Sequence, residues 1–315
     1  MPAAPTARRP ADILKTAGPA AFDELTAPAH WRCVDFIADL HLHASEPQTF
    51  QAWSGYLQHT PADALFILGD LFEVWVGDDL VTEPKTAQLH GQLHGQLHGQ
   101  LHGQFERQCA SVLKAASERL DIFFMHGNRD FLVGPALMAQ CGATMLADPT
   151  VLCSQRARWL LSHGDALCLG DVAYQAFRAL VRSGAWQRDF LAQPLSERLT
   201  TARGLRAQSE DRKKMSPQFI DVDDAAARQW LQAAGASTLI HGHTHRPADH
   251  DLSDGLRRIV LSDWDGAARP ARAEVLRLTL ALDPGSSPHA KLECKPASVE
   301  SEKFERYNIN SKLSI

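Results

Sequence analysis

The chain has 315 residues, a formal net charge of −5 and 44% hydrophobic residues. It is long enough for one large or two small domains with a sizeable core. The small negative charge gives no global argument for nucleic-acid binding, so any basic surface must be local. Six cysteines lack C-x-x-C spacing, which argues against a zinc knot or a disulfide framework and favours a reducing cytoplasm.

Both ends of the chain are expected to lie outside the folded domain. Residues 1–30 are rich in Ala and Pro and have no sustained period, which is typical of a disordered extension. Arg8 and Arg9 precede no apolar segment, and no run approaches the ~18 residues of a transmembrane helix. Residues 283–315 are polar and contain Pro-Gly-Ser-Ser-Pro near their start, which predicts a polar tail after a domain spanning 31–282.

Short apolar runs recur along the domain, and continuous runs of this length are typical of strands buried on both faces. They occupy residues 33–38, 64–68, 122–125, 159–161, 236–240, 256–261 and 273–280. Helical patterns at 109–120 and 133–140 separate some of them. The order predicts an α/β fold, a two-sheet β-sandwich flanked by helices, in which the loops after the strands converge.

A helical segment without strand signals follows the fourth run. Tyr174, Phe177 and Val181 recur at helical spacing, and Trp186 extends the apolar supply. A basic stretch comes next: Arg198, Arg203, Arg206, Arg212, Lys213 and Lys214. A solvated charged face explains such a stretch in general, but apolar and basic surface together would also suit an anionic lipid. We expect residues 166–235 to form a helical cap insertion that contacts a membrane through Tyr174, Phe177, Trp186 and the basic stretch.

Residues 82–104 form a low-complexity insertion in which Leu-His-Gly-Gln or a close variant recurs with a period of four. Its histidines could capture metal adventitiously: His90, His94, His98 and His102. A glycine in every unit weakens any helix that would align them. We therefore favour a functionally neutral insertion.

Polar side chains of the kinds that bind metals follow five of the apolar runs. They are Asp39, His41, Asp70, Asn128, His163, His243 and His245. Loops after strands carry the sites of open α/β sheets, so these seven side chains are expected to converge. In His241-Gly242-His243-Thr244-His245, alternate residues of an extended segment would present His243 and His245 to one side, and Gly242 would permit a close approach.

Seven candidate ligands are too many for one metal ion and suit two. A two-metal site needs an anionic bridge between ions ~3.5–4 Å apart, for which Asp70 is the natural candidate. A mixed Asp, Asn and His set favours Mn or Fe over a thiolate-selected metal. Asp165 could either orient an imidazole or cap a helix. His43, His126 and His241 are expected to be structural because they point the other way along the strand ends.

Five motifs stand in order between residues 33 and 265: Asp-x-His, Gly-Asp, Gly-Asn-Arg-Asp, His-Gly-Asp and Gly-His-Thr-His. Each alone is weak, but the ordered set resembles the calcineurin-like metallophosphoesterase superfamily. Longer segments resemble, more closely, the UDP-2,3-diacylglucosamine diphosphatase family of lipid A biosynthesis. These segments are 36–42, 68–73, 126–131, 174–178 and 241–247.

The resemblance implies a metal-dependent hydrolase with two Mn²⁺ ions, for which Mg²⁺ or other divalent metals could substitute. The first metal set that it implies is Asp39, His41, Asp70 and His245. The second is Asp70, Asn128, His163 and His243. In the family, a water activated by the two metals attacks the α-phosphorus of UDP-2,3-diacylglucosamine, giving UMP and 2,3-diacylglucosamine 1-phosphate (lipid X). The catalytic set that it implies is the seven ligands together with Arg129.

The resemblance also implies residues that meet the substrate. They are Asn128, Arg129, Asp171, Ser209 and His243. After Ser209 the family usually has a lysine about seven positions on, where this chain has Ser216. Lys213 and Lys214 are the candidates for that lysine's role.

Arg129 stands where many members of the superfamily have histidine. A guanidinium group is not a useful general acid and instead offers a fixed charge and a bidentate fork. A phosphate monoester, with a second pKa of ~6, leaves as a stable anion and needs no proton. Arg129 therefore favours diphosphate cleavage over phosphoserine or nucleic-acid hydrolysis.

Three functions remain open from the sequence. The diphosphatase would act in the cytoplasm, peripheral to the cytoplasmic side of the inner membrane, with no nucleic acid and no obligate protein partner. Another metallophosphoesterase, acting on nucleotides or phosphodiesters, would need a basic groove with interleaved aromatic side chains. A binding scaffold on a retired phosphoesterase fold would usually have lost ligands, and none is missing here.

Overall fold

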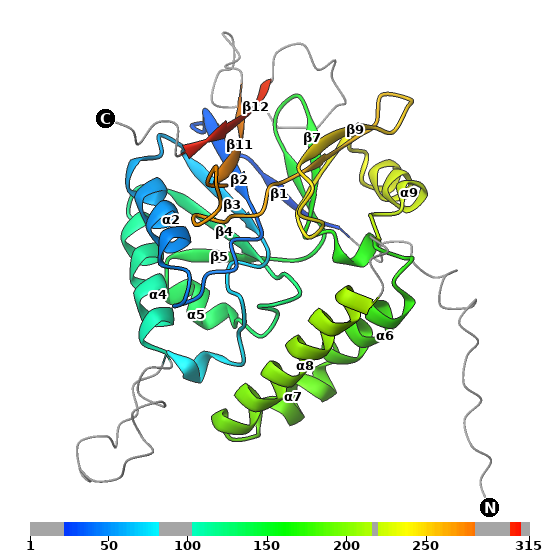
Figure 1. The fold of residues 1–315 in the computed structure, drawn as a ribbon. Helices are drawn as coiled ribbons and strands as arrows, with labels where there is room; N and C mark the ends of the chain where they lie inside the picture. The colour runs from blue at the N-terminus through cyan, green and yellow to red at the C-terminus, as the bar shows by residue number, and fades with distance from the viewer. Residues whose placement is uncertain (1–21, 82–102, 216–219, 281–302, 310–315) are drawn as a thin grey trace, which may run out of the picture.

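The computed structural model describes residues 22–81, 103–215, 220–280 and 303–309, and of residues 207–215 the backbone alone. Nearly all of the predicted insertion, 82–104, lies outside the described residues, and so do the side chains of Ser209, Lys213 and Lys214. The described chain forms two six-stranded sheets packed face to face, with helices on the outer faces and a group of helices to one side (Figure 1).

The first sheet has the strand order β12-β11-β2-β3-β4-β5. Its four parallel strands are β2 (Cys33–Ile37), β3 (Ala64–Leu68), β4 (Asp121–Met125) and β5 (Ala143–Leu146). Two antiparallel strands complete it, β11 (Glu274–Thr279) and β12 (Lys303–Asn308). Because the parallel strands run the same way, the loops after β2, β3 and β4 lie at one edge of the sheet.

The second sheet has the order β1-β6-β7-β8-β10-β9. Its strands are β1 (Asp23–Thr26), β6 (Thr150–Cys153), β7 (Arg158–Ser162), β8 (Thr238–His241), β10 (Arg257–Val260) and β9 (Ala248–Asp251). Strands β7, β8 and β10 are parallel, so the loops after β7 and β8 also meet at one edge. All seven strands that the apolar runs predict are present, and the predicted two-sheet sandwich is confirmed.

Three layers of apolar side chains hold the sandwich together. Between the sheets, the rings of Phe36, Phe66 and Phe123 stack in succession, at centroid distances of 5.3 and 4.7 Å. The outer face of the first sheet is covered by α2 (Pro47–His59), α4 (Gln104–Ala116) and α5 (Pro135–Gln140). The outer face of the second is covered by α9 (Asp224–Ala234), whose Trp230 and Leu231 are buried against it. Burial on this scale supplies most of the driving force for folding.

A cap of three helices lies to one side of the sandwich: α6 (Val172–Val181), α7 (Gly184–Leu191) and α8 (Leu195–Met215) (Figure 1). The range predicted for this cap, 166–235, is too wide, because α9 packs on the second sheet. Two short 3₁₀ helices, η1 (Asp78–Leu80) and η2 (Asp165–Leu167), lie in the loops. Among the described residues, no helix is both long enough and apolar enough to cross a membrane.

Two strands lie in segments that the sequence analysis places outside the domain. β1 falls within the predicted extension, 1–30, and pairs with β6 through all four of its residues. β12 falls within the predicted tail, 283–315, and pairs with β11 along its whole length. Both predictions are wrong at these residues. The two edge strands are short and largely polar, so neither makes an apolar run. Phe304 of β12 nevertheless packs against Phe36 and Trp159.

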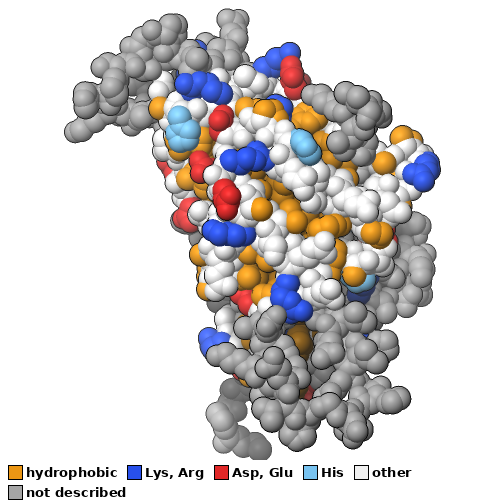
Figure 2. All heavy atoms as spheres, turned by 90° about the vertical axis from the view of Figure 1, so that its left-hand side faces the viewer, with side chains coloured by type: hydrophobic (Ala, Val, Ile, Leu, Met, Phe, Trp, Pro, Cys, Tyr) orange, Lys and Arg blue, Asp and Glu red, His pale blue; other side chains and the backbone are white. Residues whose placement is uncertain are grey.

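The surface that carries α2 and α4 mixes acidic and basic side chains, with no large patch of one sign in its described part (Figure 2). This agrees with the weak net charge of the chain.

Candidate active site

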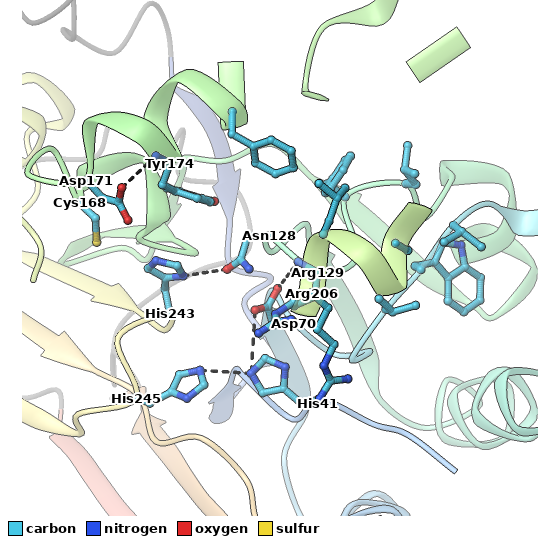
Figure 3. A pocket seen from close by; sticks show the side chains of 18 of the residues that line it. His41, Asp70, Asn128, Arg129, Cys168, Asp171, Tyr174, Arg206, His243 and His245 are labelled. Carbon is cyan, nitrogen blue, oxygen red and sulfur yellow. Dashed lines mark hydrogen bonds and ion pairs between the residues drawn. The ribbon is translucent and has the colours of Figure 1, made fainter. Parts of the chain in front are cut away.

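The structure brings all seven predicted ligands to one end of the sandwich. Asp39 and His41 follow β2, Asp70 follows β3 and Asn128 follows β4. From the second sheet, His163 follows β7, and His243 and His245 follow β8. Five of these side chains can be seen pointing toward one another in Figure 3: His41, Asp70, Asn128, His243 and His245. The site therefore depends on the packing of one sheet on the other.

Asp39, His41 and His245 form one group, with ligand atoms that all lie within 4.8 Å of one another. The Nε2 atoms of His41 and His245 are 3.2 Å apart, and Asp39 Oδ1 lies 3.4 Å from His245 Nε2. Two ligand atoms at ~2.1 Å from one ion lie about 3 to 3.5 Å apart. Asp39 Oδ1 is buried and has no hydrogen-bond partner among the described residues. Donor type, spacing and the unpartnered oxygen all fit a divalent cation.

Asp39, Asp70 and His163 form a second group by the same criterion. Asn128 extends it, because its Oδ1 lies 3.1 Å from His163 Nε2 and 2.8 Å from His243 Nδ1. Asp70 Oδ2 stands between the two groups, 4.0 Å from His41 Nε2 and 3.8 Å from His163 Nε2. This is the position that a bridging carboxylate between two ions would occupy.

Backbone N–H groups fix the two carboxylates. His243 N donates to Asp39 Oδ2, and Arg129 N donates to Asp70 Oδ1, both at 2.8 Å. Each carboxylate thus has one oxygen held by the backbone and one turned toward the imidazoles. Glycine permits the approach, because a Cβ at Gly242 would lie 2.3 Å from Asp39 Oδ2 and one at Gly127 would lie 2.0 Å from Asp70 Oδ1.

Five of the seven predicted ligands have left-handed backbone, with φ between 48° and 68°. They are Asp39, His41, Asp70, His243 and His245. Non-glycine residues in this region carry a steric cost, and such residues cluster at functional sites. The prediction that His243 and His245 alternate along an extended segment is wrong. The loop curls at both positions, so that His243 faces Asn128 and His245 faces His41.

The charges around the site are strongly coupled. Burial alone would lower the pKa of His163, but Asp70, Asp165 and Asp39 outweigh it and raise that pKa to about 9. Burial lowers the pKa of His243 to about 3. For Asp39, burial acts to raise the pKa, but the nearby imidazoles of His245 and His163 hold it below its usual range. Asp39 and Asp70 are both buried beside these imidazoles, and a metal ion bound there would compensate their charge.

Glu73 contacts His41 and Arg129 of the site, although the sequence analysis assigned it no role. Its Oε2 lies 3.0 Å from His41 Nδ1, which turns His41 Nε2 toward His245. Its Oε1 lies 3.3 Å from Arg129 Nη1 and 2.7 Å from Arg206 Nη1. A carboxylate behind a metal-binding histidine is a common support for such sites. The signal that could have identified Glu73 is its position in Leu68-Gly69-Asp70-Leu71-Phe72-Glu73, a segment that carries the family resemblance.

The sequence analysis also assigned no role to Asp130. Its carboxylate accepts hydrogen bonds from Gly127 N and Leu71 N, both at 2.8 Å, and so ties the loop after β4 to the loop after β3. Burial and the charge of Asp70 raise the pKa of Asp130 to about 7. Asp130 therefore fixes the spacing of the Asp70 and Asn128 loops.

Asp165 has neither of the contacts considered for it. Its carboxylate accepts from Tyr174 Oη at 2.6 Å and pairs with Arg178 Nε at 2.8 Å, and both partners lie on α6. Asp171 caps α6, because its side chain accepts from Tyr174 N. Asp165 thus anchors the cap to the loop after β7, next to His163.

The three histidines expected to be structural lie outside both ligand groups. His126 Nε2 donates to the Val133 carbonyl at 2.7 Å, and His241 is buried beside the Gly242 carbonyl and Arg258. His43 is exposed, with its Nδ1 2.7 Å from Ser45 Oγ.

A cavity of about 560 Å³ leads from the site into the space under the cap. Its far walls are mainly apolar: Trp75, Phe131, Phe177, Trp186, Phe190 and Leu205. Arg129, Asp171, Tyr174 and Arg206 line the part near the site (Figure 3). Tyr174, Phe177 and Trp186 therefore line the cavity, and the membrane contact predicted for them stays a prediction. The exposed large apolar side chains among the described residues are Val172, Leu180 and Leu191.

Two known proteins whose sequences are similar to this chain carry the same name. UDP-2,3-diacylglucosamine hydrolase of Chromohalobacter salexigens is 41% identical over 249 residues, covering 77% of this chain and 91% of that protein. The protein of the same name from Chromobacterium violaceum is 42% identical over 242 residues, covering 74% and 91%. No family model matches the chain.

Among solved structures, a dimetal phosphatase of Danio rerio is 14% identical, with a TM-score of 0.42, covering 81% of this chain and 93% of that one. Vps29 of Entamoeba histolytica is 15% identical, with a TM-score of 0.38, covering 88% and 99%. Identity near 41% over about three quarters of the chain decides the family. The chain belongs to the UDP-2,3-diacylglucosamine hydrolase family.

Proposed function

We propose that this protein hydrolyses the diphosphate bond of UDP-2,3-diacylglucosamine, releasing UMP and 2,3-diacylglucosamine 1-phosphate in lipid A biosynthesis. One observation carries the proposal beyond the family relationship: the cluster of seven predicted metal ligands opens into an apolar cavity of about 560 Å³. Such a cavity suits acyl chains, and the cluster suits the charged diphosphate to which they are joined.

In this proposal two Mn²⁺ ions would be held by the two sets that the family resemblance implies, with Asp70 in both. Bound ions supply Lewis acidity and lower the pKa of water toward neutrality. The chain's own part is to hold Asp39 and Asp70 by backbone N–H groups and His41 by Glu73, so that the ligands are arranged before the substrate binds.

Arg129 has the contacts expected of a residue that binds the diphosphate. It lines the cavity beside Asp70 and Asn128, and Glu73 orients its guanidinium group. Its fixed charge would stabilise the departing sugar 1-phosphate without donating a proton. We propose Asn128, Arg129, Asp171 and His243 as substrate contacts, together with Ser209, Lys213 and Lys214 on α8.

A second candidate is a metallophosphoesterase that acts on nucleotides or phosphodiesters. The apolar walls under the cap weigh against it, because a nucleic-acid groove is basic along its length. A binding scaffold is disfavoured because all seven ligands are present and arranged.

Metal removal provides the direct test. The purified protein with Mn²⁺ is expected to release UMP from UDP-2,3-diacylglucosamine, and excess chelator should lower the rate at least about a hundredfold, equivalent to ~2.7 kcal/mol of transition-state stabilisation. Adding Mn²⁺ back should restore the rate, and comparing Mg²⁺ would establish the preferred metal. Cleavage of a generic phosphodiester with this substrate left intact would retain the metal site and overturn the lipid assignment. No cleavage of either would favour the scaffold.

We also propose that the protein acts in the cytoplasm, as a peripheral protein of the inner membrane, because its lipid substrate lies there. Val172 and Leu180 on α6 and Leu191 on α7 are 55%, 56% and 42% exposed, and could enter the interfacial region. The double variant Val172→Asp/Leu180→Asp is therefore expected to float with anionic liposomes several times less than the wild type. The control variant Gln48→Asp/Gln51→Asp adds two charges at exposed positions of α2, outside the cap. Equal flotation of all three proteins would overturn the proposed contact.

A further inference from the structure

A second cavity of about 460 Å³ lies beside the candidate metal centre. Its walls are mainly polar, in contrast to the cavity under the cap. The residues that distinguish it are His43, Ser45, Glu46, Asp263, Asp265 and Arg272. They come from the segment before α2 and from the loop between β10 and β11. Nothing in the proposed function so far occupies this space.

The two cavities share four lining residues: His41, Arg129, Arg206 and His245. Two of these are candidate metal ligands and two are arginines paired with Glu73. The cavities therefore meet where a diphosphate would be bound and cleaved. A substrate that lies across this junction has one end in apolar surroundings and the other in polar surroundings.

The polar cavity offers the groups that a nucleoside needs. Asp263 and Asp265 supply carboxylates that can accept hydrogen bonds from ribose hydroxyls, and Arg272 holds both at 2.9 and 3.3 Å. Ser45 adds an exposed hydroxyl to the wall. Trp264 also lines the cavity, and its indole Nε1 is buried without an acceptor among the described residues. Buried donors are normally paired, so this donor is an exception.

We propose that this polar cavity is the nucleoside subsite, which binds the uridine half of the substrate while the cap binds the acyl half. The inference rests on the proposed function. A volume of about 460 Å³ falls within the usual range of ligand sites, ~300–1,000 Å³. The opposite arrangement would bury a polar base and ribose among the aromatic side chains under the cap and leave acyl chains in a polar space, and both placements cost free energy.

The proposal predicts how the two products inhibit. Attack at the α-phosphorus leaves the cleaved phosphate on UMP, so UMP would bind at the metal centre and in the polar cavity, while the lipid product would bind under the cap. Ser45→Trp fills the polar cavity from an exposed position that contacts no candidate ligand. It is expected to weaken inhibition by UMP about tenfold, ~1.4 kcal/mol, and to leave inhibition by 2,3-diacylglucosamine 1-phosphate unchanged.

Matched variants separate this effect from a general one. Gln51→Trp adds the same side chain at an exposed site of α2 that lines neither cavity, and should inhibit like the wild type. Phe177→Ala, under the cap, should weaken inhibition by the lipid product and not by UMP. Arg272→Ala removes the guanidinium that holds Asp263 and Asp265, and should weaken inhibition by UMP at least about threefold.

Wild-type protein that leaves UDP-2,3-diacylglucosamine intact would overturn the proposed function. Equilibrium dialysis of UMP against the Mn²⁺-loaded protein tests the subsite independently of turnover. Unchanged binding of UMP to both folded variants, Ser45→Trp and Arg272→Ala, would overturn the subsite, even if the wild type cleaves the substrate. Weakened binding to both, with Gln51→Trp unaffected, would support it.

Discussion

Replacing Asp70 by alanine is expected to lower the rate of UMP release by about a thousandfold, a loss of the size seen when a preorganised electrostatic contact is removed. Asp70 is buried, with Oδ1 fixed by Arg129 N and Oδ2 between His41 and His163. It lies between the two ligand groups, where a carboxylate would bridge two ions. Its loss would affect both metal sets together, whereas loss of His245 would affect one.

The variant should also bind less metal, which can be measured without substrate. Elemental analysis after gel filtration is expected to give fewer than two Mn²⁺ per chain for Asp70→Ala and two for the wild type. Asp189→Ala removes an exposed carboxylate on α7 and should keep both metal and activity. An Asp70→Ala protein with full metal content and full activity would show that Asp70 is not the bridge.

The site could be predicted because residues of metal-binding types directly follow the strands. A ligand type and its position after an apolar run can be read from the sequence, because parallel strands bring their carboxyl ends to one edge. The seven side chains do converge, and they come from both sheets. Their pairing could not be read in the same way, because it depends on backbone conformation. His243 and His245 are two residues apart, yet left-handed φ angles of 68° and 54° direct them to Asn128 and His41.

Supporting contacts between distant segments were the least predictable. Glu73 reaches Arg206 on α8, and Asp165 reaches Arg178 on α6, through side chains that have no periodic pattern. The same applies to β12, whose Tyr307 donates to Asp35 beside Arg277. Each contact becomes visible only when the two sheets and the cap are assembled. A polar segment of six residues resembles a tail until its partner strand is known.

Replacing Asp165 by alanine is expected to lower the free energy of unfolding by about 3 kcal/mol, the lower end of the usual range for breaking a buried ion pair. Asp165 is fully buried, and its carboxylate joins Arg178 and Tyr174 of α6 to the loop after β7. Asp148 explains why the loss should be at the lower end. It lies 3.7 Å from Arg178, and burial and the charge of Asp165 raise its pKa. Removing Asp165 relieves that repulsion and leaves Arg178 a second carboxylate.

Urea denaturation of the metal-free protein would measure the loss, with Asp189→Ala as the control for a removed carboxylate. Arg178→Ala should destabilise in its own right, because it leaves Asp165 and Asp148 buried with less compensating charge. The double variant should then cost clearly less than the two single losses added together, since the groups share one network. Additive losses would contradict the network.

Because α6 carries Tyr174 and Phe177 in the cavity wall, a loosened cap should also raise the KM for the lipid substrate. The stability of the cap and the binding of the acyl chains are thus expected to change together.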